Sequence, residues 1–179
     1  MLVLVVGPSG AGKDTVLGIA RLALAGDPRF RFVRRVITRP ADAGGEDHEA
    51  VSEAAFAARR FALQWQAHGL HYGIPAEIID DLARGIVTVA NVSRGVIARA
   101  AERFPIRVIE VTAPPDILAR RLAERGRETA EDVARRLGRD VPIPRHVPID
   151  TVLNDRTPAE AADCFVAALT RAAESAPPA

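Results

Sequence analysis

Residues 7–13 (Gly-Pro-Ser-Gly-Ala-Gly-Lys) have the types and the spacing to bind the phosphates of a nucleotide. They follow the apolar run 2–6 and precede a helix-like segment, so strand, glycine-rich turn and helix come in the order of a P-loop. The glycines let backbone N–H groups point at phosphate oxygens, and the lysine adds a compact positive charge. We expect nucleotide contacts from Gly7, Pro8, Ser9, Gly10, Ala11, Gly12, Lys13, Asp14 and Thr15.

The residue after Lys13 departs from the usual motif. A serine or threonine normally follows the lysine and gives its hydroxyl to Mg²⁺, whereas Asp14 stands here and Thr15 comes one place later. A carboxylate is also a hard oxygen ligand that suits Mg²⁺. We therefore expect Asp14 to hold the Mg²⁺ of a bound nucleotide.

Composition limits the class of protein. A chain of 179 residues with 48% hydrophobic residues suits one domain, residues 1–179, with a substantial core. The net charge of +1 gives no reason to expect nucleic-acid or membrane binding. The lone Cys164 excludes an intrachain disulfide, and its apolar surroundings predict a core position. The first apolar run is too short for a signal peptide or a membrane span, so we expect a cytoplasmic protein.

Apolar runs alternate with helix-like segments along the chain, which predicts an α/β fold with a mainly parallel sheet. In such sheets ligands bind at the carboxyl ends of the strands. Ser52 is expected as one helix N-cap, and Thr157 to Glu160 form a capping box for the last helix. We expect strands at 2–6, 31–38, 86–90, 106–111 and 147–153, and helices at 13–25, 52–60, 75–84, 95–103, 114–125, from 129 onward and 157–173.

Lys13 is the only lysine among 24 Lys and Arg residues, so the remaining cations are arginines. Most of them are expected on solvated helix faces. Arg39 and Arg94 lie in turns after strands, beside the expected pocket, and guanidinium groups bind phosphate in a bidentate fashion. We therefore favour phosphate contacts for these two, and leave both roles open for Arg120, Arg135 and Arg136.

The chain resembles the guanylate kinase group of nucleoside monophosphate kinases. The similar motifs are the P-loop, residues 37–40 (Ile-Thr-Arg-Pro) leading to Gly45-Glu46, and residues 71–73 (His-Tyr-Gly), while residues 122–137 resemble the mobile lid of that group. The resemblance covers nearly the whole chain. It implies a P-loop NMP-kinase-like three-layer α/β fold with a five-stranded parallel sheet, an acceptor-binding insertion at about 39–80 and a lid at about 125–140.

Three details depart from guanylate kinases. Residues 41–43 (Ala-Asp-Ala) stand where the group has a second arginine, and Leu63-Gln64 stand at or beside its guanine-reading glutamate. The acidic residue expected before Gly95 is also missing. A guanine site needs acceptors for the ring N–H and amino donors, and leaving these donors unpaired is costly. Guanosine monophosphate is therefore a poor candidate acceptor.

The longer motifs are more similar to the ribose 1,5-bisphosphate phosphokinase family. They are residues 12–15, 36–40, 45–52, 65–75 and 91–94. This resemblance implies Mg²⁺-dependent transfer of the γ-phosphoryl of ATP to the 1-phosphate of ribose 1,5-bisphosphate, giving 5-phosphoribosyl 1-diphosphate and ADP in phosphonate metabolism. It implies catalytic roles for Lys13, Arg39, Arg127 and Arg136, nucleotide contacts from Arg125 and Asn154, and substrate contacts from Arg35, Arg39, Glu46, His48, Tyr72 and Arg94.

The implied reaction agrees with the residue types. A phosphate-monoester acceptor has a second pKa near about 6 and is already a dianion at neutral pH, so it needs no general base. An alcohol acceptor would need one, and Glu46, Asp47 or Glu49 could supply it. A nucleoside monophosphate kinase and a non-catalytic guanylate-kinase-like interaction module stay as alternatives, although the intact loop and arginine-rich lid disfavour the module. Homo-oligomerisation is left open.

Overall fold

The computed structural model describes residues 1–41, 46–124 and 141–175. Its main sheet is parallel throughout, because every pair of neighbouring strands runs in the same direction. This confirms the predicted α/β fold with a five-stranded parallel sheet. The strand order is β2 (Phe30–Phe32), β7 (Val87–Asn91), β1 (Leu2–Val6), β8 (Ile106–Thr112) and β9 (Ile149–Leu153).

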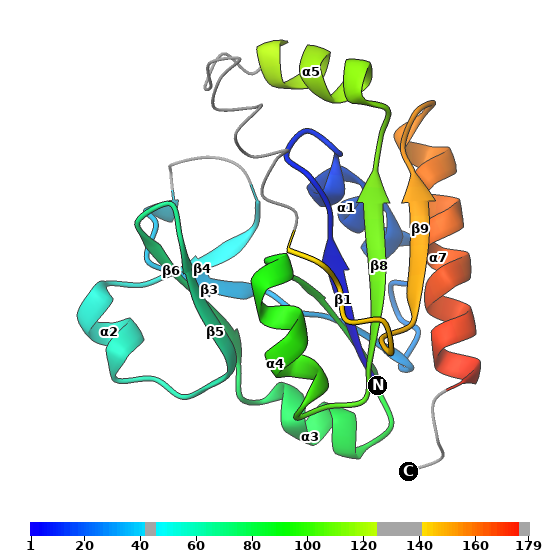
Figure 1. Cartoon of the computed structure of the whole chain (residues 1–179). Coiled ribbons are helices and arrows are strands. Elements are labelled where there is room, and N and C mark those ends of the chain that lie inside the picture. Colours follow the sequence, from blue (N-terminus) through cyan, green and yellow to red (C-terminus); the bar gives the residue numbers. More distant parts are fainter. Residues whose placement is uncertain (42–45, 125–140, 176–179) are drawn as a thin grey trace.

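The central strand β1 is buried on both faces, as its unbroken apolar run predicts. Val3 and Val5 pack into one core, while Leu2, Leu4 and Val6 pack into a second core on the other face. Helices therefore cover both sides of the sheet (Figure 1). They are α1 (Lys13–Ala23) and α7 (Pro158–Glu174) on the first face, α3 (Ile78–Ala83) and α4 (Ile97–Ala101) on the second, and α5 (Pro115–Glu124) after β8.

A second, smaller sheet lies beside the first, and three of its four strands come from the described part of the predicted insertion (Figure 1). Its strands β3 and β4 are parallel, while β6 is antiparallel to both β3 and β5. Ala62, Leu63 and Ile74 from this sheet join the second core, so the small sheet is packed against the main one. The order is β4 (His48–Ala50), β3 (Arg35–Ile37), β6 (Leu70–Pro75) and β5 (Phe61–Ala67), with α2 (Glu53–Ala57) after β4.

The single strand expected at 31–38 is wrong, because the chain divides it between the two sheets. The N–H of Val33 still donates to Val89 O of the main sheet at 2.9 Å, whereas the N–H of Thr38 donates to His71 O of the small sheet at 3.1 Å. The change of partner falls at Arg34, between β2 and β3. An apolar-and-basic alternation is compatible with either sheet, so the pattern could not show the break.

The helix expected at 75–84 begins later, at Ile78, because Pro75 is the last residue of β6 and pairs with Phe61. The β5–β6 hairpin itself was not expected. Its turn has two residues with positive φ, His68 at 53° and Gly69 at 72°, which is the backbone of a tight hairpin turn. The His-Gly dipeptide between two apolar runs was the missed signal.

Three local expectations can be checked at the helices. The Ser52 hydroxyl accepts from Ala55 N at 3.2 Å, so the predicted N-cap is confirmed. The core position expected for Cys164 is wrong, since it is exposed on α7 while its neighbour Phe165 is buried.

No helix in the described ranges is long and apolar enough to cross a membrane. The helix expected from residue 129 and the whole predicted lid, 125–140, lie outside the described residues.

The predicted capping box at Thr157 is confirmed, and it gives a stability test. The hydroxyl of Thr157 accepts from Glu160 N at 3.2 Å, and the Glu160 carboxylate accepts from Thr157 N at 3.1 Å. Thr157→Ala should lower the free energy of unfolding by about 1 kcal/mol, because it leaves a helix N–H without its partner. Urea denaturation should show this loss, and Thr157→Ser, which keeps the hydroxyl, should recover most of it.

Candidate active site

The P-loop follows β1 with a backbone that only glycine adopts easily. Gly7, Gly10 and Gly12 have φ values of 148°, 86° and 81°. At Gly7 a Cβ atom would lie 1.9 Å from the carbonyl oxygen of Val111, so the loop crosses the neighbouring strand at a distance that excludes any side chain. The loop ends at Gly12, the N-cap of α1, so the helix N-terminus faces the loop.

The ammonium of Lys13 lies inside this loop. Its Nζ donates to the carbonyl oxygens of Gly7 at 2.8 Å and Pro8 at 2.9 Å. The side chain therefore folds back over the turn instead of extending into solvent. This is the position from which an ammonium can reach the phosphate oxygens of a nucleotide held by the loop.

The side chain of Asn154 packs against the backbone of the loop. It is only 2% exposed, and its Nδ2 donates to Ala11 O at 2.8 Å. The same Nδ2 would be 2.5 Å from a Cβ at Gly12, and Arg121 donates to the Asn154 carbonyl oxygen at 3.1 Å. The side chain is buried against the loop backbone, and the nucleotide contact expected for Asn154 stays a prediction.

Asp14 lies in the first turn of α1 with an exposed carboxylate. Its Oδ1 accepts from Nδ2 of Asn91, the last residue of β7, at 3.1 Å. This leaves the other oxygen of Asp14 available beside the loop, which suits a hard cation that also binds phosphate oxygens. Thr15 is exposed as well, but it does not line the cavity in front of the loop.

The loop opens on a cavity of about 390 Å³. Gly7, Ser9, Gly10, Gly12, Lys13 and Asp14 line one side, and Asn91 to Ser93 continue that side. The small sheet forms the opposite side. From it come Arg35, Arg39, Glu46, Trp65, Ala67, His68 and Tyr72, so residues far apart in the sequence meet at the carboxyl ends of the main strands as predicted.

Two arginines share one carboxylate on this opposite side. Arg35 Nε donates to Glu46 Oε2 at 2.7 Å, and Arg39 Nη2 lies 3.6 Å from Glu46 Oε1. All three side chains are less than a quarter exposed. The guanidinium of Arg35 also lies 5.5 Å from the centre of the Tyr72 ring, which stacks on Trp65. The cluster is a cationic surface that lies across the cavity from the P-loop.

His48 and Arg94 do not line the cavity. His48 is 4% exposed, and its two ring nitrogens lie beside two carbonyl oxygens, Nδ1 3.0 Å from Glu46 O and Nε2 3.1 Å from Arg39 O. Its Nδ1 also lies 3.3 Å from Arg39 Nη2, so the ring packs against Arg39 outside the cavity. Arg94 forms an ion pair with Glu110 of β8. Arg125, Arg127 and Arg136 lie outside the described residues.

Asn91 is one of the cavity residues to which the sequence assigned no role. It lines the cavity and also orients the Asp14 carboxylate. Its position, a polar residue at the carboxyl end of a strand next to β1, was the signal that could have identified it.

Comparisons with known proteins place the chain in a family. No family model matches it. It is 53% identical over 173 residues to ribose 1,5-bisphosphate phosphokinase PhnN of Acidiphilium cryptum, covering 95% of this chain and 92% of that protein. It is 44% identical to the protein of the same name from Agrobacterium fabrum, covering 99% and 100%. A bifunctional ribose 1,5-bisphosphokinase-thymidine phosphorylase of Azorhizobium caulinodans is 52% identical over 171 residues, but there the chain spans only 25% of its relative.

Solved structures agree on the fold. Guanylate kinase from Anaplasma phagocytophilum superposes with a TM-score of 0.68 over 96% of this chain and 85% of that one, at 17% identity. A sugar kinase from Janibacter sp. gives a TM-score of 0.53 over 98% of each chain, also at 17% identity. These structures show a kinase-like fold and carry no further detail at such low identity. On the sequence matches, the chain belongs to the ribose 1,5-bisphosphate phosphokinase family.

Proposed function

We propose that this chain transfers the γ-phosphoryl group of ATP to the 1-phosphate of ribose 1,5-bisphosphate, giving 5-phosphoribosyl 1-diphosphate and ADP. The observation that carries the proposal is the arrangement of the cavity, where the P-loop faces two arginines across a space of about 390 Å³. One side suits the triphosphate and the other suits an anionic acceptor. Membership of the family names the acceptor.

The proposed step needs charge neutralisation more than proton transfer. An oxygen of the acceptor's 1-phosphate forms a bond to the γ-phosphorus, and the bond from that phosphorus to the β–γ bridging oxygen of ATP breaks. Lys13 stabilises the charge on the transferred group, and Arg39 holds the acceptor phosphate in line. Since the acceptor is already a dianion at neutral pH, no side chain has to remove a proton.

Asp14 is the residue we propose for Mg²⁺. One carboxylate oxygen is oriented by Asn91, and the group lies at the edge of the loop that would hold the β- and γ-phosphates. Mg²⁺ is commonly held by one or two carboxylates together with substrate phosphates, which fits this donor set. We also propose that Arg127 and Arg136 contact the transferred phosphoryl and that Arg125 lies near the adenine.

The proposal is tested by which acceptor the protein phosphorylates. A coupled ADP-release assay should give turnover with ribose 1,5-bisphosphate and far less with ribose, which brings no phosphate to the guanidinium groups that face the loop. Turnover with guanosine monophosphate should also be far lower, because Leu63-Gln64 stand at or beside the position of the guanine-reading glutamate. ATP hydrolysis without acceptor is the background to subtract. Turnover with guanosine monophosphate alone would reject the proposal in favour of a nucleoside monophosphate kinase. No turnover with any acceptor would favour an interaction module.

Lys13→Ala should lower kcat/KM by about a hundredfold or more, because the transferred phosphoryl loses its charge partner. The fold should survive, since the hydrogen bonds from Lys13 to Gly7 and Pro8 stay within its own loop and the side chain is only half-buried. Circular dichroism and thermal unfolding check the fold beside the rate. Near-normal turnover in this variant would mean that the loop is not the triphosphate site.

Asp14→Asn should raise the Mg²⁺ concentration needed for half-maximal rate by about tenfold or more, because the metal loses a negative oxygen ligand. Thr15→Ala is the matched control, since Thr15 is the neighbouring exposed residue and does not line the cavity. A magnesium titration of both variants separates the two residues. The reverse result, with only Thr15→Ala raising the requirement, would assign the metal to the threonine hydroxyl.

A further inference from the structure

A second cavity, of about 190 Å³, adjoins the first. Asp14, Arg35, Glu46 and Asn91 line both, so the two spaces meet beside the start of α1. The second cavity extends away from the P-loop, along α1 and the end of β2. Its remaining side is apolar, with contributions from Leu17, Phe32, Val33 and Val89.

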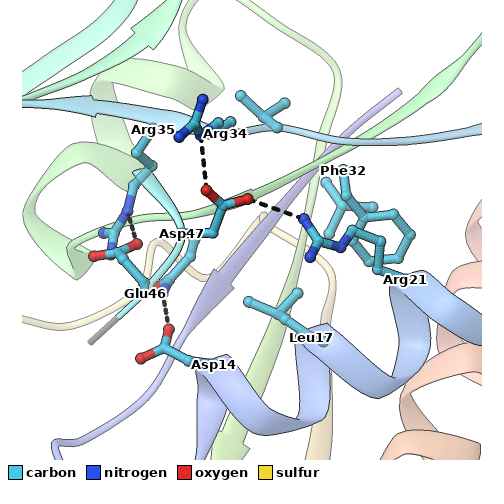
Figure 2. Close-up of a pocket in the computed structure, with 12 residues that line it drawn as sticks. Asp14, Leu17, Arg21, Phe32, Arg34, Arg35, Glu46 and Asp47 are labelled. Atoms are coloured by element: carbon cyan, nitrogen blue, oxygen red, sulfur yellow. Dashed lines mark hydrogen bonds and ion pairs between the residues drawn. The ribbon is translucent and has the colours of Figure 1, made fainter. Parts of the chain in front are cut away.

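Two arginines from different elements approach one carboxylate in the lining of this second cavity (Figure 2). Arg21 comes from α1, and Arg34 comes from the turn between β2 and β3. Asp47 lies between them, with Oδ2 3.4 Å from Arg21 Nη1 and Oδ1 2.8 Å from Arg34 Nε. All three side chains are more than half exposed. Two cations thus share a single carboxylate, so these three groups carry a net charge of +1, while the other charged residues of the lining, Arg35, Asp14 and Glu46, add a net charge of −1.

The proposed acceptor has two phosphates at opposite ends of one ribose, and only one of them reacts. The reacting phosphate must face Lys13, so the other must find cations elsewhere. Among the described residues that line the two cavities, the arginines are Arg35 and Arg39, which share Glu46 opposite the loop, and the pair Arg21 and Arg34.

We propose that the second cavity is the subsite for the 5-phosphate of the acceptor, with Arg21 and Arg34 as its ligands; this inference rests on the proposed function. The apolar side of the cavity then lies under the ribose, and Arg35 lies between the two phosphates. Guanidinium groups that approach from two elements can bind one phosphate dianion with several charge-assisted hydrogen bonds.

The Asp47 carboxylate occupies the position, between Arg21 and Arg34, that we propose for that phosphate. A carboxylate between two guanidinium groups is a singly charged anion in a position that a dianion would occupy with greater Coulomb attraction. The acceptor would displace Asp47 from Arg21 and Arg34. The aspartate therefore competes with the substrate. Removing its charge should strengthen binding of the 5-phosphate, whereas removing an arginine should weaken it.

The test compares Arg21→Gln with Asp47→Asn in the full chain. Arg21→Gln should lower kcat/KM for ribose 1,5-bisphosphate by about tenfold, from the loss of one charge-assisted contact. It should weaken inhibition by ribose 5-phosphate to a similar extent, while the inhibition constant of ribose 1-phosphate and KM for ATP stay unchanged. Asp47→Asn should strengthen inhibition by ribose 5-phosphate, because the competing charge is gone.

Two further variants check that the effect belongs to this cavity. Arg34 also donates to His48 O at 2.9 Å, so its variant is Arg34→Lys, which keeps the positive charge. This variant should still weaken inhibition by ribose 5-phosphate, because an ammonium cannot bind the phosphate in a bidentate fashion. Arg29→Gln is the matched control, since Arg29 is an equally exposed arginine paired with Asp27 and lines neither cavity. It should leave all four constants unchanged.

The outcomes separate this inference from the proposed function. If the wild-type protein uses ribose 1,5-bisphosphate but Arg21→Gln leaves inhibition by ribose 5-phosphate unchanged, the subsite is overturned and the proposed function stands. If Asp47→Asn weakens that inhibition as much as Arg21→Gln does, the three residues only hold the fold, and the subsite is again overturned. If the wild-type protein does not use ribose 1,5-bisphosphate, the proposed function fails and the inference fails with it.

Discussion

The whole site depends on how closely the first turn crosses the neighbouring strand. β1 and β8 are paired in register from Leu2 to Val6, so the chain leaves β1 directly beside Val111. Only a residue without a Cβ can make that crossing, and Gly7 stands there. The close approach holds the turn against the end of β8, and the cavity on the other side of the turn has room for phosphate. Asn154, after β9, then fixes the loop at Ala11. Three strand ends thus hold one loop, which is why its backbone can be aimed at a ligand.

Opposite and beside that loop, the small sheet and α1 bring arginines together with carboxylates that partly neutralise them. Two adjacent carboxylates each form ion pairs with two arginines: Glu46 lies between Arg35 and Arg39, and Asp47 lies between Arg21 and Arg34. Without the acids, neighbouring guanidinium groups would repel each other, and the partly buried ones would stay unpaired. With them, the site keeps its shape before substrate binds, and a dianion then replaces a weaker anion at part of the cluster.

How far the sequence could predict this site depends on whether a feature is local. The buried strand β1 and the capping box at Thr157 are set by residues close together in the chain, and the structure confirms them. The glycine-rich turn is equally local, and it lies between β1 and α1 as expected. The partners of Arg94 and His48 are not local. Arg94 meets Glu110 only because the sheet brings β7 and β8 to either side of β1, and His48 reaches Arg39 only through the pairing of β3 with β4. The three-residue strands β3 and β4 give patterns too brief to identify, whereas the longer β5–β6 hairpin had a turn signal in His68-Gly69.

The same fold in a guanylate kinase and a sugar kinase, each 17% identical to this chain, means that the fold alone does not choose the acceptor. That choice has to come from the side chains of the small sheet and of α1. A purine would require donors and acceptors matched to the edge of the base. The charged side chains that line these cavities are guanidinium groups, carboxylates and the Lys13 ammonium, beside aromatic and amide side chains such as Tyr72 and Asn91, and the second cavity has an apolar side. Such a surface distinguishes ligands by where their negative charges lie, and a small molecule with an anion at each end is what it can recognise best.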